Sequence, residues 1–236
     1  MSSVETHPEK NIIRVQLTQN GVLTALSDAD RGELEKLLTV VDCAKGDFLL
    51  NQGVTDMEQY FVLDGVLKRV VANPQGKEMI LRFSDERDME TSYAAWRLGT
   101  PTPYSIVSVT KVRVAKLPLP LWVAFMEARP SIKSSFEHSV MKLMSEILAH
   151  TITLHLLDAP GRVNRFMRKH PDLFERLPKK GAGLVFEFVS RNAQSPETAR
   201  EDLGQARATR HWRRCTPPKG APAENQCKTD LFELFD

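Results

Sequence analysis

Histidine and cysteine side chains are the usual ligands of zinc and other transition metals, and neither type is clustered in this 236-residue chain. A metal site inside a β domain would need several such ligands close together, yet all 6 histidines lie outside residues 40–116, where the expected strands concentrate. The 3 cysteines form no CxxC pair, which argues against a disulfide framework, a haem or an iron–sulfur cluster. The histidines are His7, His138, His150, His155, His170 and His211, and the cysteines are Cys43, Cys215 and Cys227. The sequence therefore predicts no cofactor, no metal and no enzyme activity.

Arginine side chains gather near the end of the chain, where they offer contacts to phosphate groups. The cluster consists of Arg207, Arg210, Arg213 and Arg214 around Trp212. Two interpretations stay open: nonspecific contacts with nucleic-acid phosphates, or a solvated and partly disordered tail. The net charge of +2 for the whole chain does not by itself indicate a nucleic-acid binder.

Spaced glycines between residues 45 and 76 reveal the elements that would position a site. Turn residues there alternate with short apolar runs at 48–50, 60–63, 66–71 and 79–83, and residues 106–117 alternate again. Many short strands joined by tight turns predict an antiparallel β-roll, with glycines reaching the positive φ that such turns need. A roll of this kind usually encloses a ligand pocket, so the pattern bears on function as well as on fold.

Helical patterns flank the expected roll. Two short helices are predicted within residues 23–38, a short helical turn within 87–98, a helix over 121–128, a long helix over 131–157 and a further helix over 161–177. The fold class is therefore α+β, with a β-roll, flanking helices and a long helix behind it. Residues 181–236 lose clean periodicity, and 216–226 resemble a loop or a disordered tail.

The long helix carries a regular apolar stripe with alternating spacings of four and three, which is the heptad pattern of a coiled coil. Its members are Phe136, Val140, Leu143, Ile147, His150, Leu154 and Leu157. One interpretation is an amphipathic helix packed on its own domain. The other is a helix that pairs with its copy in a homodimer, and the position of the stripe beyond a complete β domain favours it. His150 is expected to be packed or solvated, although its pKa range would also permit a pH switch.

Three ordered motifs connect the chain with a known family. They are Lys45-Gly46-x-x-Leu49-Leu50-x-x-Gly53, Tyr60-Phe61-Val62-Leu63-x-Gly65 and Gln75-Gly76-Lys77-Glu78. With the long helix that follows, residues 22–177 resemble the superfamily of the cyclic-AMP receptor protein and the fumarate–nitrate regulator (Crp/Fnr). The resemblance implies a cyclic-nucleotide-binding β-roll, a dimerisation helix and a C-terminal winged helix-turn-helix for DNA.

The resemblance also implies where a nucleotide would bind, and there the sequence departs from the family. In that family a glycine and backbone N–H groups approach the phosphate, a glutamate binds the ribose and an arginine pairs with the phosphate. Aligned on Asp88, these positions are occupied by Thr91, Ser92 and Tyr104. A shifted register would bring in Glu90 but misplace Asp88, and neither register supplies the arginine.

We therefore expect that cyclic AMP is not bound in the usual way, because a buried phosphate would lack its fixed positive partner. Two alternatives stay open for this ligand pocket. Its side chains serve a different small-molecule effector, or they fill the pocket themselves. The pocket residues are Asp88, Thr91, Ser92, Tyr93, Tyr104 and Ser105.

The expected helix-turn-helix does not appear in the sequence after Lys180, and one permitted choice of codons offers a reason. One permitted back-translation of residues 181–203, read one base later, gives E-L-A-S-Y-L-N-L-S-R-E-T-L-S-R-L-K-Q-R-G-K-I. This peptide resembles the missing module, with a recognition helix that opens at S-R-E-T-L-S-R. The wobble bases in this translation are free choices, so the observation permits a frameshift without requiring one. Our hypothesis is a frameshift, real or an artefact of sequencing, that replaced the DNA-binding module.

Five segments follow from these observations: a polar N-terminal arm at 1–21, a cyclic-nucleotide-binding-like sensor domain at 22–129, a dimerisation helix at 130–158, the remnant start of a winged helix-turn-helix at 159–180 and an altered tail at 181–236. The expected function is a homodimeric Crp/Fnr-type transcription regulator that binds DNA only if its helix-turn-helix is intact. The alternative is a stand-alone ligand-binding or interaction module. The N-terminus has no apolar signal core and no segment is long enough to span a membrane, so we expect no membrane partner and a cytoplasmic location.

Overall fold

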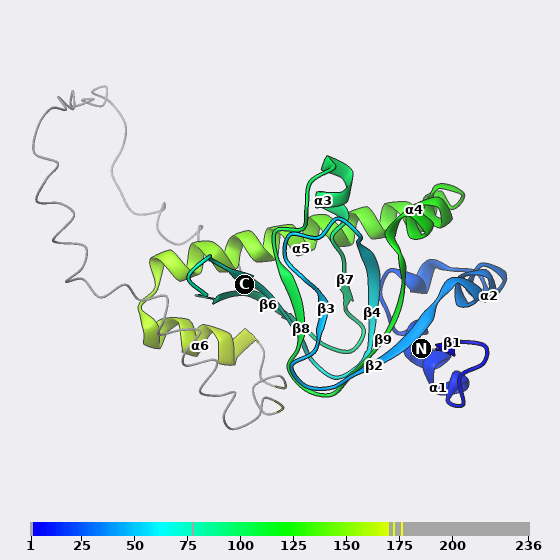
Figure 1. Ribbon diagram of the computed structural model, residues 1–236, viewed down its shortest axis with the longest axis horizontal. Helices are drawn as coiled ribbons and strands as arrows, with labels where there is room; N and C mark the ends of the chain where they lie inside the picture. Colours follow the sequence, from blue (N-terminus) through cyan, green and yellow to red (C-terminus); the bar gives the residue numbers. More distant parts are fainter. Residues whose placement is uncertain (1, 77, 170–171, 173–175, 177–236) are drawn as a thin grey trace, which may run out of the picture. The chain divides into compact units, whose positions relative to one another are not determined.

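Two antiparallel sheets form the centre of the computed structural model (Figure 1), which describes residues 2–76, 78–169, 172 and 176. One sheet has the strand order β1-β2-β9-β4-β7 and the other β3-β8-β5-β6. The strands are β1 Ser2–Ser3, β2 Thr39–Cys43, β3 Phe48–Leu50, β4 Glu58–Asp64, β5 Leu67–Ala72, β6 Glu78–Ser84, β7 Met89–Glu90, β8 Ser105–Ser108 and β9 Val112–Pro118. The predicted antiparallel roll is confirmed: the runs at 48–50, 60–63 and 79–83 lie in strands, the run at 66–71 forms β5 from Leu67 onward, and residues 106–117 divide between β8 and β9.

Helices surround the sheets, and apart from α1 they follow the order that the sequence predicts. They are α1 Lys10–Thr18, the short 3-10 helix η1 Leu23–Ala25, α2 Asp28–Leu37, α3 Tyr93–Leu98, α4 Leu119–Glu127, α5 Pro130–Leu156 and α6 Ala159–Lys169. The long ribbon of α5 runs past the ends of several strands (Figure 1). No helix among the described residues has the length and apolar content to cross a membrane.

Apolar side chains form two cores, one on each side of the five-stranded sheet. The outer core lies between that sheet and the helices, and centres on Trp122, whose ring meets Phe61 and Phe136 edge to face at 5.4 and 5.5 Å. The inner core lies between the two sheets and includes Tyr60, Leu67 and other strand residues. Alternating strand residues supply both cores because neighbouring side chains point to opposite faces.

Gly65 shows why the turns require glycine. Its φ is +90°, and a Cβ atom there would meet the carbonyl oxygen of Lys111 and lie 2.9 Å from Cα of Val112. Both the left-handed backbone and the close approach of the β8–β9 turn exclude a side chain. The glycine therefore serves the fold, as the sequence predicts.

The N-terminal segment differs from the prediction of a polar arm. β1 pairs with β2, α1 packs against the roll, and Val4, Ile13 and Leu17 are buried in the outer core. Ile13 and Leu17 are four residues apart and so share one face of α1. The prediction was wrong because the apolar residues of α1 do not form one clear stripe: Ile12 and Val15 are exposed, and only Ile13 and Leu17 are buried.

The chain divides into two units, 1–192 and 193–236, and every described residue belongs to the first. The predicted altered tail at 181–236, the arginine cluster, Cys215 and Cys227 lie outside the described residues. Of the predicted helix over 161–177, the described part is helical to Lys169 and again at residues 172 and 176. Cys43 is buried and free of a disulfide.

Candidate functional site

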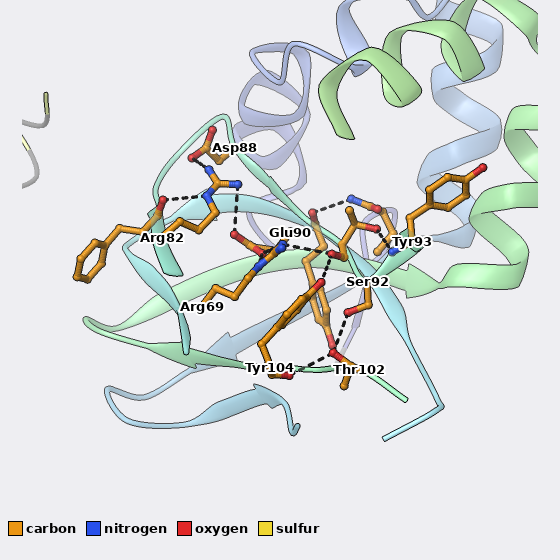
Figure 2. Close-up of polar contacts among 12 residues, drawn as sticks. Arg69, Arg82, Asp88, Glu90, Ser92, Tyr93, Thr102 and Tyr104 are labelled. Atoms are coloured by element: carbon orange, nitrogen blue, oxygen red, sulfur yellow. Dashed lines mark hydrogen bonds and ion pairs between the residues drawn. The ribbon is translucent and has the colours of Figure 1, made fainter. Parts of the chain in front are cut away.

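The structure brings most of the predicted pocket residues together in the roll, where β7 and the start of α3 lie near β8. Thr91, Ser92, Tyr104 and Ser105 are all buried there. Figure 2 shows that two arginines and a glutamate, from β5, β6 and β7, reach the same place. The site is thus built around charged groups as well as hydroxyls.

Arg69 and Glu90 form an ion pair that is completely buried, with both side chains 0% exposed. The Nε atom of Arg69 donates to Glu90 Oε2 at 3.0 Å, and its Nη2 group donates to the same oxygen and, at 3.2 Å, to the carbonyl of Thr91. Burial alone would lower the pKa of Arg69, but the attraction of Glu90 outweighs it and raises that pKa. Burial would likewise raise the pKa of Glu90, and Arg69 together with Arg82 lowers it instead. Both partners are therefore charged.

Tyr104 occupies the position where the family resemblance implies an arginine. Its ring covers the Arg69 guanidinium, with Cζ at 4.1 Å from the ring centroid, and its hydroxyl donates to the carbonyl of Thr91 at 2.7 Å. A guanidinium over a tyrosine face gains a cation–π attraction. Burial raises the pKa of the Tyr104 phenol, which keeps the phenol protonated as a donor. The tyrosine thus closes the space beside Arg69.

Arg82 extends the charged network toward the surface. Its Nη2 group binds Asp88 Oδ2 at 3.0 Å, and its Nη1 atom lies 3.4 Å from Glu90 Oε1 (Figure 2). Desolvation, with added repulsion from Asp85 and Glu90, raises the pKa of Asp88 to about 6, although Arg82 opposes the rise. Asp88, Arg82, Glu90 and Arg69 therefore form a row of alternating charge from the rim to the interior.

The hydroxyl groups of the site are also engaged within the chain. Ser92 Oγ lies 3.4 Å from Thr102 Oγ1, and Thr102 Oγ1 donates to the carbonyl of Tyr104 at 3.2 Å. Ser105 Oγ accepts from the backbone N–H of Gln52 at 2.9 Å. Because these contacts lie among the protein's own groups, the hydroxyls serve to hold the start of α3, the segment ahead of β8 and the residue that follows β3 by two positions in place.

Tyr93 is the predicted pocket residue that lies apart from the others. Its ring points away from the Arg69–Glu90 pair (Figure 2), packing edge to face on Phe136 at 5.1 Å and stacking on Trp96 at 6.3 Å in the outer core. α3 places the Tyr93 side chain on the far side from Ser92. We therefore remove Tyr93 from the candidate pocket.

The sequence analysis did not identify Arg69 and Arg82, because they lie on strands outside the segment in which the family resemblance places the nucleotide contacts. A signal was present: Arg69 lies between apolar Leu67 and Val70 within a strand, where a charged residue is unusual unless it is paired. Its partner, Glu90, follows the buried Met89 in the same way. No group of three metal-ligating side chains occurs among the described residues.

The predicted dimer stripe on α5 lies partly inside the chain's own domain. Phe136 is 0% and Leu143 4% exposed, and Val140 packs against the outer core. Ile147 and His150 are half-buried on α5, Leu157 is half-buried just beyond it, and Leu154 is a helical residue of α5. The first half of this stripe is therefore a domain contact, as the first of our two interpretations expected.

A different stripe of α5 is apolar and exposed. Its members, with their exposed fractions, are Met141 at 64%, Met144 at 41%, Leu148 at 61%, Ile152 at 40% and Leu156 at 75%. Their spacing of three and four residues places them along one face of the helix. The apolar face available to a partner is thus rotated away from the predicted stripe.

Comparison with known proteins supports the fold. Residues 40–129 match the family model of the cyclic nucleotide-binding domain. A regulatory protein of Silicibacter pomeroyi DSS-3 with proposed cAMP binding has a TM-score of 0.51 and 20% identity, over 83% of this chain and 87% of that one. A mutant of CooA from Carboxydothermus hydrogenoformans has a TM-score of 0.50 and 16% identity, over 61% of each chain. No curated protein matches the chain.

Residues 40–129 therefore form a domain with the cyclic nucleotide-binding fold. At these identities the solved structures establish the fold alone.

Proposed function

We propose that the chain is the sensor and dimerisation part of a Crp/Fnr-type transcription regulator that does not bind cyclic AMP through an arginine–phosphate pair. The observation that carries the proposal is the buried Arg69–Glu90 pair under Tyr104, in a domain of the cyclic nucleotide-binding fold. A phosphate needs a positive partner, and the charge of the interior arginine is already neutralised by a carboxylate. A second anion there would meet Glu90 in a dry environment, where repulsion between like charges is strong.

Calorimetric titration of the full chain with cyclic AMP tests this step. We expect no saturable heat in the micromolar range. Micromolar affinity for cyclic AMP would contradict the proposal, because it would require the phosphate to find a cation that the pair leaves free.

The proposed homodimer uses the exposed stripe of α5. An apolar row on a long helix is typical of helix pairing, since burying it removes apolar area from water. Leu148→Glu is expected to shift the chain from dimer to monomer in sedimentation velocity, because it would bury a charge in that contact. Leu98→Glu is the matched control, because Leu98 is 77% exposed on α3. Equal sedimentation of both variants and the parent chain would remove the dimer proposal.

The DNA-binding step rests on the frameshift hypothesis for the segment after Lys180. Sequencing the gene across that codon tests the hypothesis first. A gel shift on the region upstream of the gene then compares the present chain with a frame-restored version. We expect binding from the restored version alone, through recognition-helix contacts in the major groove. No binding from either version would favour the stand-alone ligand-binding or interaction module.

A further inference from the structure

A crevice separates the β6–β7 loop from α5, outside the buried network of the roll. Its walls come from the loop, from residues 20–22 ahead of η1 and from one face of α5, and its volume is about 200 Å³. Pockets for drug-sized ligands span about 300–1,000 Å³. The crevice therefore suits a group of a few heavy atoms rather than a nucleotide.

Three cationic side chains line this crevice: Arg82, Arg87 and Lys142. Arg82 already forms ion pairs with Asp88 and Glu90. Arg87 and Lys142 are exposed, and their charged groups have no ion-pair partner within the described part of the chain. Glu146 and Asp88 are the carboxylates among the lining residues, so the cations outnumber the anions.

The backbone at Arg87 is held in a strained conformation. Its φ is +76°, a left-handed value that ordinarily favours glycine. Asn20, which is 2% exposed, fixes this shape by donating its side-chain amide to the carbonyls of Arg87 at 2.9 Å and Asp88 at 3.2 Å. The exposed Arg87 side chain has no ion-pair partner among the described residues, so it makes no such contact that would offset the strain of its backbone. Backbone strain of this kind is commonly found at functional positions.

We propose that this crevice binds a small oxyanion, a phosphate or a carboxylate, through Arg87 and Lys142. Guanidinium and ammonium groups form charge-assisted hydrogen bonds with both kinds of anion. The proposal goes beyond the function proposed above, because it depends neither on dimerisation nor on DNA binding.

The crevice is also joined to the interior of the roll. Arg82 lies on its wall and binds Asp88 at the rim and Glu90 in the interior (Figure 2). An anion that attracts Arg82 competes with both carboxylates. Occupation of the crevice would therefore be transmitted to the Arg69–Glu90 pair, which is what a sensor domain requires.

The test is a titration of the full chain with inorganic phosphate and, separately, with succinate, at constant ionic strength held with sodium chloride. Calorimetry is performed on the parent chain and on Arg87→Gln and Lys142→Gln. We expect saturable binding of at least one anion, weakened about tenfold or more in each variant because a charge-assisted contact is lost. The anion that binds more tightly shows whether the crevice prefers a phosphate or a carboxylate group.

Lys133→Gln is the matched control, since Lys133 is an exposed lysine on α5 and is not among the residues that line the crevice. This variant is expected to bind as the parent chain does. Thermal melts verify that all variants fold. No saturable binding of either anion to the parent chain overturns the proposal, and so does equal binding by the parent chain and both crevice variants.

Discussion

The interior of the roll and the crevice beside α5 contain the same types of charged side chain in opposite conditions. Arg69 is fully buried, forms an ion pair with Glu90 and is covered by Tyr104, although its Nη1 group has no hydrogen-bond partner within the described part of the chain. Arg87 is exposed, strained and unpaired among the described residues. Water solvates an unpaired charge at the surface but cannot do so inside, so only the inner arginine had to acquire a partner. The contrast indicates that the interior arginine stabilises the fold, whereas the arginine in the crevice is available to bind a ligand.

The largest expected effect comes from breaking the inner pair. Arg69→Met leaves Glu90 buried and without its main partner, which we expect to cost about 3–5 kcal/mol of unfolding free energy in urea denaturation. The double variant Arg69→Met/Glu90→Leu removes both charges and is expected to recover most of that loss. Arg87→Gln in the crevice is expected to change stability by about 0.5 kcal/mol or less. A single Arg69 variant as stable as the parent chain would show that the inner pair is not structural.

A smaller effect of opposite sign is expected for Arg87→Gly. Glycine adopts the positive φ at this position without strain, so we expect a gain of about 0.5–1 kcal/mol in the free energy of unfolding. The same change should abolish oxyanion binding in the crevice. Lower stability after this substitution would mean that the arginine side chain supports the fold, and would remove the argument from strain.

A third effect concerns pH and Asp88, which joins the two regions. Its pKa in the folded chain is raised to about 6 from the ordinary value of 3.8, so the folded state binds the proton more tightly than the unfolded state does. Protonation of Asp88 therefore stabilises the folded chain, and this stabilisation is lost as pH rises from about 4 to about 6.

Chemical denaturation at pH 4, 5, 6 and 7 checks this contribution by the difference between the parent chain and Asp88→Asn. The difference cancels the lowered pKa values of carboxylates such as Asp42 and Glu90, whose stabilising contribution is lost as pH falls. We expect the stability of the parent chain relative to the variant to fall between pH 4 and pH 6. A difference that stays constant would contradict the raised pKa.

The sequence predicts the roll well because turn glycines and apolar runs are local signals, as Gly65 and β3 illustrate. It also predicts that a tyrosine replaces the expected arginine. It does not predict Arg69 opposite Glu90, since that pair is 21 residues apart in sequence and meets only after β5, β6 and β7 assemble. The sequence leaves the role of the predicted stripe on α5 open for a similar reason. Heptad spacing alone does not decide which apolar face of a helix the domain itself covers, and Phe136 and Leu143 are on the covered face.

The most direct test follows the side-chain Nε–H resonances of Arg69 and Arg87 by nuclear magnetic resonance in one sample of the full chain. We predict a Nε–H signal of Arg69 that exchanges slowly with water and does not move when cyclic AMP is added. The Nε–H signal of Arg87 should exchange quickly and shift on titration with phosphate or succinate. A shift of the Arg69 signal at micromolar cyclic AMP would contradict the account, because it would show that the inner arginine is available to a nucleotide.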